Sequence, residues 1–280
     1  MKLRLLIIAA LCAVFATLTT EAALAGGGAR YYVALGDSLA RSAQPNGDYQ
    51  HGYAEQLLAL LQPRDPSLRL VKLACGGATT TDMVYGSDDR SCAFPHKTQL
   101  AEAVAFLNAH RRFVVLVTID IGGNDLPDRA AIATNLPIIL DELRTAAGPR
   151  VPIVGMNYYD PSLVGVWFGF DVNHPSCAPR APTLAAEVQR ATADNDFLEG
   201  FYQADPADGA APYADVERAF EVTDTTPDVD VNGDGVLEPR DVVRECQWTW
   251  MCFPPPLAPD IHANTAGYGV IAQAFLDALT

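Results

Sequence analysis

The sequence predicts an α/β sandwich, in which helices cover both faces of a parallel sheet. Apolar strand-like runs recur at 31–35, 68–73, 113–121 and 151–157, and the last two are nearly continuous, as in strands that are buried on both faces. Helix-like segments alternate with these runs, which favours a parallel sheet with right-handed crossovers. In such sheets, ligands bind beyond the carboxyl ends of the strands.

The first 25 residues have the pattern of a secretory signal peptide (1–25). Lys2 and Arg4 precede the apolar run 5–18, and Ala23-Leu24-Ala25 offers a small-residue cleavage site. We therefore expect a secreted, extracellular protein. No later apolar run reaches the about 18 residues that a membrane span needs, so we expect no stable membrane anchor.

The remaining elements are expected to form a single domain over 26–280. Its helix-like segments lie at 53–62, 97–110, 130–147, 181–203 and 265–279. The third of these should bend or break at Pro137. The apolar stretch VGVWFGF (164–170) is expected to line a pocket, to act as a lid or to pack under a neighbouring loop. The segment 204–260 interrupts the alternation and contains an insertion at about 224–245.

Charge and cysteine content restrict the partners and the compartment. The formal net charge of −15 argues against nucleic acid and anionic membrane surfaces, because both attract basic patches. An exported chain meets an oxidising environment, where disulfides persist. We predict a Cys75–Cys92 bridge, because it closes a short span and would pin the loop that carries Gly77. A second bridge should join two of Cys177, Cys246 and Cys252.

Four polar blocks lie where loops of the predicted sheet can converge. GDS (36–38) follows the first strand, and its serine is either a helix N-cap or a nucleophile. LACGGATTTDM (73–83) allows backbone N–H groups to face a ligand, and IGGNDL (121–126) offers a side-chain amide. PDIHANTAGYGVIA (259–272) adds a histidine with a nearby carboxylate. Together these groups are what acyl transfer requires.

With these blocks in this order, the chain resembles the SGNH hydrolases, also called GDSL esterases or lipases. GMNYYDP (155–161) and WTWMC (248–252) further resemble their secreted actinobacterial-type branch. The resemblance implies a flavodoxin-like three-layer α/β/α sandwich with a mostly parallel central sheet, the SGNH hydrolase fold. It also implies a serine esterase or lipase that cleaves small-molecule or lipid carboxylic esters without a catalytic cofactor. The alternatives are a carbohydrate acetylesterase and a catalytically silent, calcium-stabilised binding protein on the same scaffold.

The resemblance also implies roles for individual residues. Ser38 would attack the substrate carbonyl, and His262 would remove its proton. The oxyanion hole would comprise the N–H groups of Ser38 and Gly77 and the side-chain amide of Asn124. These residues make a Ser-His(-Asp) mechanism.

The family's commonest pattern places Asp three residues before the catalytic histidine, where this chain has Pro259. We assign the carboxylate role to Asp260, two residues before His262. The alternative is a backbone carbonyl, which orients the histidine in some members of the family. The literal D-x-x-H of Asp171 and His174 follows the fourth strand, so we interpret it as a decoy.

A second constellation, DVNGDGVLEPRD (230–241), matches the EF-hand calcium loop. Oxygen ligands fall at positions 1, 3, 5, 7, 9 and 12 of that pattern: Asp230, Asn232, Asp234, Val236 through its carbonyl, Glu238 and Asp241. The loop resembles a single dockerin repeat, and the alternative is an acidic turn without metal. We predict one structural calcium ion. Because a dockerin needs two such repeats, we expect no cohesin partner.

Overall fold

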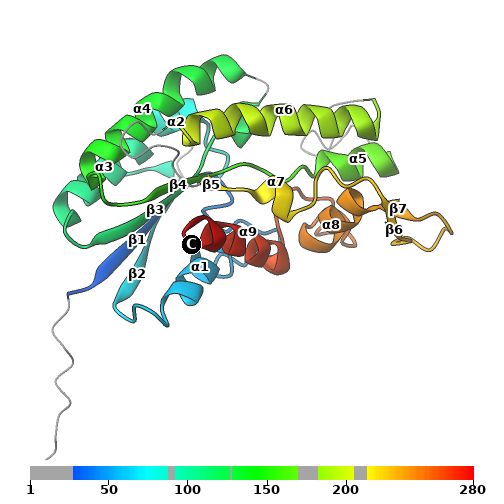
Figure 1. Ribbon diagram of the computed structural model, residues 1–280, viewed down its shortest axis with the longest axis horizontal. Helices are drawn as coiled ribbons and strands as arrows, with labels where there is room; N and C mark the ends of the chain where they lie inside the picture. Colours follow the sequence, from blue (N-terminus) through cyan, green and yellow to red (C-terminus); the bar gives the residue numbers. More distant parts are fainter. Residues whose placement is uncertain (1–27, 88–91, 127, 170–181, 205–212) are drawn as a thin grey trace, which may run out of the picture.

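A parallel five-stranded sheet forms the centre of the computed structural model, which describes residues 28–87, 92–126, 128–169, 182–204 and 213–280 (Figure 1). All four neighbouring strand pairs are parallel. In spatial order the strands are β2 (Leu68–Ala74), β1 (Arg30–Gly36), β3 (Val114–Asp120), β4 (Ile153–Met156) and β5 (Tyr213–Ala214). The order 2-1-3-4-5 is that of flavodoxin-like sheets. The predicted fold class is therefore confirmed.

Helices cover both faces of this sheet and give three layers (Figure 1). One face carries α1 (Tyr53–Leu61) and α9 (Thr265–Ala278). The other carries α2 (Thr80–Tyr85), α3 (Gln99–His110), α4 (Arg129–Ala147) and α6 (Leu184–Tyr202). The five predicted helices agree with α1, α3, α4, α6 and α9. α4 continues through Pro137 as one helix, so of the bend or break expected there, the break does not occur.

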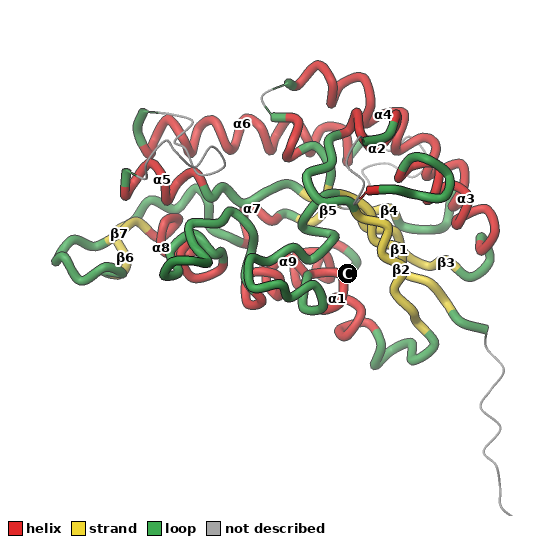
Figure 2. Tube along the Cα trace, turned by 180° about the vertical axis from the view of Figure 1, so that it is seen from behind, coloured by secondary structure: helices red, strands yellow, loops and turns green. Residues whose placement is uncertain are grey.

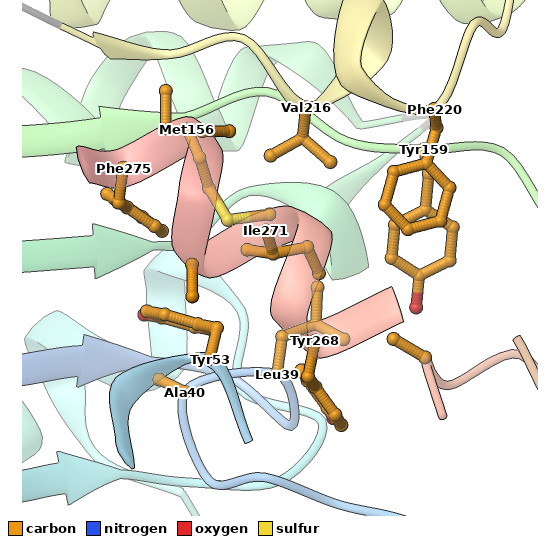
Figure 3. Close-up of a cluster of buried hydrophobic side chains, with 14 of the residues drawn as sticks. Leu39, Ala40, Tyr53, Met156, Tyr159, Val216, Phe220, Tyr268, Ile271 and Phe275 are labelled. Atoms are coloured by element: carbon orange, nitrogen blue, oxygen red, sulfur yellow. The ribbon is translucent and has the colours of Figure 1, made fainter. Parts of the chain in front are cut away.

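The sheet separates two hydrophobic clusters, because successive strand residues point to opposite faces. Tyr32 and Ala34 of β1 contribute to the cluster under α1 and α9, whereas Val33 and Leu35 contribute to the cluster on the other face. Figure 3 shows side chains of α1, α9 and β4 in the first cluster, where the rings of Tyr53 and Phe275 stack with centroids 4.8 Å apart. This packing holds the strands in place, and with them the loops that follow their carboxyl ends.

Residues 164–168 of the apolar stretch lie in a helix, α5 (Ser162–Phe168), which the sequence analysis did not predict. Leu163 and Val164 are fully buried, so this part of the stretch packs in the interior. Among the described helices, none combines the length and the hydropathy that a membrane crossing requires.

The segment 204–260 contains four further short elements within its described part. They are α7 (Val216–Ala219), β6 (Pro227–Val229), β7 (Glu238–Pro239) and α8 (Arg240–Trp248). β6 and β7 form an antiparallel hairpin that projects beyond α8, at the opposite end of the molecule from β2 (Figure 2). α8 packs against α5 and α9. It thereby connects the hairpin to the helix that closes the fold.

Two disulfides tie loops of the protein together. The predicted Cys75–Cys92 bridge is confirmed, with Cα atoms 5.2 Å apart. The second bridge joins Cys246 and Cys252, one of the three pairings that the sequence left open. Cys177 lies outside the described residues, as do the predicted signal peptide and the pair Asp171 and His174.

Candidate active site

β1 leads directly into the Ser38 turn, which we define as residues 37–42. The turn is closed by backbone N–H groups: that of Arg41 donates to Asp37 O at 3.1 Å, and that of Ser42 donates to Leu39 O at 2.9 Å. No helix begins at Ser38 in the part of the chain that the structure describes, so its interpretation as an N-cap is wrong. Asp37 acts as the local cap instead, because its Oδ1 accepts the N–H of Leu39 at 2.9 Å.

The loops after β2 and β3 meet beside this turn. Gly77 lies in the first loop with a φ of 72°, a conformation that a residue with a Cβ rarely adopts. Asn124 lies in the second, in the 3-10 turn η2 (Gly123–Asp125). Its Nδ2 donates to Ala78 O at 3.0 Å and to Asp37 Oδ2 at 3.3 Å. The amide of Asn124 therefore joins the glycine-containing loop to the Ser38 turn.

The loop before α9 brings the predicted histidine and carboxylate together. Nδ1 of His262 lies 2.7 Å from Oδ1 of Asp260, which also accepts the backbone N–H of His262 at 2.9 Å. The loop is held from two sides: Trp250 N–H donates to His262 O at 3.0 Å, and the Tyr159 hydroxyl donates to Ile261 O at 2.9 Å. With Nδ1 occupied by the carboxylate, Nε2 is the ring nitrogen that remains for a reacting group.

Ser38, Asn124 and His262 line one cavity of about 120 Å³, at the carboxyl ends of the strands. Gly77 is exposed and is not among the described residues that line it. Asp260 is absent from that lining as well, because it lies behind the histidine ring. The cavity is thus lined by three of the five residues to which the sequence analysis assigned a role in the reaction.

The wall that includes Arg190 is polar. The Arg190 guanidinium donates to Asp160 at 2.5 Å, to Glu187 at 2.5 and 2.8 Å, and to Asp194 at 2.6 Å. Burial and, after it, the charge of Asp160 raise the pKa of Glu187 to about 6. Three carboxyl groups around one guanidinium give this wall hydrogen-bonding capacity without excess positive charge.

The sequence analysis missed two residues of this region. The Tyr158 hydroxyl lines the cavity side of the Ser38 turn and donates to Asp37 Oδ2 at 3.2 Å. Asp120, at the end of β3, is fully buried beneath the turn. A signal for Asp120 was available, because it is the one acidic residue inside the apolar run 113–121.

The acidic loop, which we define as residues 230–241, forms a separate cluster at the β6–β7 hairpin. Carboxylate oxygens of Asp230, Asp234 and Glu238 lie within 4.8 Å of one another. Backbone N–H groups of Gly235 and Gly233 donate to Asp230 at 2.9 and 2.6 Å, and the donor at Gly235 is the main cause that lowers the pKa of Asp230.

The other three predicted metal ligands are placed differently. The Asn232 side chain makes two hydrogen bonds with Asp234. Its Nδ2 donates to Asp234 Oδ2 at 3.0 Å, and its Oδ1 accepts the backbone N–H of Asp234 at 2.9 Å. Val236 lies in the same loop, and its N–H donates to Asp234 Oδ1 at 2.8 Å. Asp241 is fully buried in the first turn of α8 and is not part of the three-carboxylate cluster.

The sequence model of the GDSL-like Lipase/Acylhydrolase family matches residues 34–270. A search of curated proteins found no match. Among solved structures, the chain is similar to LAE5, an alpha/beta hydrolase enzyme from the metagenome of Lake Arreo, Spain, at 21% identity and a TM-score of 0.48, with 90% of this chain and 96% of that chain covered.

The chain is also similar to the solved structures of two named esterases. Axe2, an acetylxylan esterase from Geobacillus stearothermophilus, is 18% identical with a TM-score of 0.47, over 90% of this chain and 95% of that chain. A family 3 carbohydrate esterase of Clostridium thermocellum is 17% identical with a TM-score of 0.49, over 89% and 94% of the two chains.

Proposed function

The chain belongs to the GDSL-like lipase/acylhydrolase family and is a carboxylic ester hydrolase, and from this premise we propose that it is a secreted serine esterase that forms an acyl-enzyme on Ser38. The observation that carries the proposal is the shared cavity of Ser38, Asn124 and His262. The signal-peptide pattern and the two disulfides support secretion, because disulfides persist in oxidising compartments.

In the proposed reaction, the Ser38 hydroxyl oxygen attacks the ester carbonyl carbon while Nε2 of His262 takes the hydroxyl proton. The tetrahedral intermediate collapses, and His262 returns this proton to the departing alcohol. Water then attacks the acyl-enzyme by the same route, which releases the carboxylic acid and restores Ser38. Asp260 holds the ring through Nδ1 and stabilises the imidazolium that forms in each half-reaction.

The oxyanion would be bound by the N–H groups of Ser38 and Gly77 and by the Asn124 amide. The Asn124 amide is held beside the Ser38 turn by its contacts with Ala78 O at 3.0 Å and Asp37 Oδ2 at 3.3 Å. Losing one such donor typically costs about 3 to 4 kcal/mol of transition-state stabilisation. The geometry supports Asn124 more directly than Gly77, because Asn124 lines the cavity.

The size and polarity of the cavity favour esters with short acyl groups. A volume of about 120 Å³ is small against the about 300 Å³ or more of sites that enclose drug-sized ligands. The same cavity is lined by Asp160, Arg190 and Asp194, which offer partners for hydroxyl groups on the alcohol side of the ester. These two observations make a carbohydrate acetylesterase the second candidate, beside a general carboxylesterase.

A panel of acetyl, butyryl and long-chain esters tests this proposal, together with an acetylated oligosaccharide and a serine-reactive phosphonate. We expect acetyl and butyryl esters to be cleaved with higher kcat/KM than long-chain esters. The phosphonate should abolish activity and leave one adduct, which peptide mass spectrometry should locate at Ser38. An adduct elsewhere with retained hydrolysis would refute the assignment of Ser38.

We further propose that the acidic loop binds one structural calcium ion. Three carboxylates provide hard oxygen ligands within 4.8 Å of one another, which is compatible with Ca²⁺ coordination. A second observation supports a cation here: Glu238 is only 1% exposed, and its Oε1 has no hydrogen-bond partner in the described part of the chain. A buried carboxylate oxygen without a partner is costly, and a bound cation would remove that cost.

The ion would brace the segment that leads to the catalytic histidine. The acidic loop continues into α8, and the residues after α8 pair with the His262 loop through Trp250 N–H and a backbone bridge between Thr249 and Ala263. Because an ion that binds only the folded state stabilises it, we expect the melting temperature to rise with calcium concentration.

Thermal unfolding tests the calcium proposal. The melting temperature should fall in chelator and recover with calcium, but much less with magnesium, which demands near-octahedral geometry. Asp234→Ala should lose the calcium response, whereas Asp141→Ala, at an exposed position of α4, should keep it. If the wild-type protein melts identically in excess calcium and in chelator after verified metal removal, the loop is an acidic turn.

A further inference from the structure

Two buried carboxyl groups, those of Asp37 and Asp120, lie within hydrogen-bonding reach of each other beneath the Ser38 turn. Asp37 is 3% exposed and Asp120 is 0% exposed. Asp120 is connected to the turn at three points: its Oδ2 accepts Ala40 N–H at 3.0 Å, its backbone carbonyl accepts Asp37 N–H at 3.0 Å, and its carboxyl contacts the Asp37 carboxyl. Its Oδ1 also accepts the hydroxyl of Tyr53 at 2.9 Å.

The backbone of β1 closes tightly over the Asp120 carboxyl. Gly36 has a φ of 133°, and a Cβ at this position would overlap the Asp120 carboxyl group. The Gly36 N–H and carbonyl are both held by the Gln99 side chain, at 2.9 Å each. The last residue of β1 is thus fixed against Asp120 immediately before the reacting serine.

A hydrogen bond between two carboxyl groups requires that one of them carries a proton. Without it, two negative charges would lie in contact in the interior, which is strongly unfavourable. A neighbouring cation does not provide an alternative, because neither group forms an ion pair with lysine or arginine in the described ranges of the chain. The pair therefore holds a single negative charge together with one proton.

The groups that face this pair come from several elements, and almost all are tyrosines. They are Tyr32 of β1, Tyr53 of α1, Tyr158 and Tyr159 after β4, Tyr202 of α6 and Tyr268 of α9. Burial raises the pKa of each of these tyrosines, so they remain neutral donors. His262 is the facing group that can become positive, and its charge favours the ionised form of Asp37.

The hydrogen bonds indicate which member carries the charge. The Asp37 carboxylate accepts from three donors of the site, Leu39 N–H, the Asn124 amide and the Tyr158 hydroxyl. Burial raises the pKa of Asp37, whereas the contacts with Asp120, Leu39 N–H and the Tyr158 hydroxyl and the charge of His262 oppose that shift. For Asp120, burial and, after it, the charge of Asp37 raise the pKa well above its usual range.

We propose that Asp120 is a positioning residue for the reaction at Ser38: its carboxyl group stays protonated, donates to the Asp37 carboxylate and thereby holds the Ser38 turn and Asn124 in register. This inference rests on the proposed ester hydrolysis at Ser38. Asp120 acts through Asp37, since it does not line the cavity, whereas Asp37 does. The proton keeps one negative charge, not two, beside the oxyanion donor Asn124.

Two variants at position 120 test the proposal kinetically. Asp120→Ala removes both the proton donor and the acceptor of Ala40 N–H, and we expect kcat to fall about 100-fold, as for a displaced oxyanion-hole donor. Asp120→Asn keeps a donor toward Asp37 and an acceptor for Ala40, so it should retain kcat within about tenfold. KM should change little in both, because Asp120 does not line the cavity. Asp141→Asn is the matched control.

The pH profile of kcat separates positioning from simple packing and remains informative if Asp120→Ala does not fold. In the wild-type protein, kcat should fall reversibly as pH rises through the elevated pKa of Asp120, because the second ionisation places two like charges in contact. In Asp120→Asn this alkaline fall should be absent. If wild type and Asp120→Asn show the same alkaline limb, or if Asp120→Ala keeps wild-type kcat, the proposal is wrong.

Infrared difference spectroscopy tests the proton without reference to activity. At pH 8, the wild-type spectrum minus that of Asp120→Asn should contain the C=O stretching band of a protonated carboxyl group. Absence of this band overturns the inference even if the enzyme is an esterase. Conversely, if the band is present but phosphonate labels no serine and no ester is cleaved, the proposed function fails and the proton assignment stands.

Discussion

The Ser38 turn and the acidic loop both gather carboxyl groups, but they satisfy the oxygen atoms in different ways. Beneath the turn, Asp37 and Asp120 accept hydrogen bonds from backbone N–H groups and from tyrosine hydroxyls. In the acidic loop, backbone N–H groups satisfy Asp230, yet Glu238 Oε1 is buried without a partner in the described chain. The first region is complete as folded, whereas the second has room for a cation.

This difference predicts which perturbation each region responds to. A region whose polar atoms are satisfied by its own chain depends on the identity of its side chains and should be insensitive to dissolved ions. A region with an unpartnered buried oxygen should gain stability from a cation at little cost to the rest of the fold. Mutations at the turn should therefore change turnover, and metal removal should change stability.

The largest effect should come from the reacting pair itself. Ser38→Ala and His262→Ala should each lower kcat by about 10⁴-fold or more, because a nucleophile and its base act as one unit. Initial rates on an acetyl ester measure this loss, with circular dichroism as the check that the fold is intact. His174→Ala should keep activity. Near wild-type turnover in Ser38→Ala would refute Ser38 as the nucleophile. Activity that is lost in His174→Ala but kept in His262→Ala would show that His174 is the catalytic base.

A smaller loss should follow from Asp260→Ala. The His262 loop retains other contacts, among them those from Trp250 N–H and the Tyr159 hydroxyl, so the ring should stay near the cavity without its carboxylate. We expect kcat to exceed that of His262→Ala by roughly 10- to 100-fold, the relation found when the acidic member of a triad is removed alone. Equal losses in the two variants would mean that Asp260 is needed to build the loop.

The two disulfides allow the same comparison for stability. The Cys75–Cys92 bridge spans 17 residues beside the Ser38 turn, whereas Cys246–Cys252 spans 6 residues after α8. In the chain-entropy model, replacing each pair by serines should lower the free energy of unfolding by about 3 and about 2 kcal/mol, respectively. Denaturant unfolding measures both. The first variant alone should also lose turnover, because it frees the loop that carries Gly77; equal turnover losses in both would contradict this.

How much the sequence predicted depends on the range of the interactions. β1 and β3 were evident because long apolar runs identify strands that are buried on both faces. β5 has two residues and α8 has nine, in a segment rich in Pro, Asp and Gly, so neither contains a long apolar run. Tertiary packing stabilises them, as when Glu245 of α8 accepts the backbone N–H of Asp160 at 2.8 Å.

The candidate site divides in the same way. Ser38, Asn124 and His262 lie in short motifs that can be identified without a partner. Asp120 could not be assigned a role, because its significance depends on contact with Asp37, 83 positions earlier in the chain, and on burial that single-residue reasoning does not give. Asp241 was grouped with the metal ligands by spacing, but the start of α8 buries it apart from their cluster.

The smallest expected effect is that of calcium on turnover at low temperature. In the described part of the chain, α8 and the backbone bonds between residues 248–250 and 262–264 connect the acidic loop to the active site. At a temperature far below the melting transition, chelator or Asp234→Ala should therefore change kcat less than about twofold, since the folded population is nearly complete in either case. Stopped assays at about 25 °C measure kcat with calcium and with chelator, and Asp141→Ala is the control. If chelator at this temperature lowers kcat as much as Asp260→Ala does, the ion positions His262 directly. Metal removal would then change turnover as well as stability, which contradicts the proposed difference between the Ser38 turn and the acidic loop.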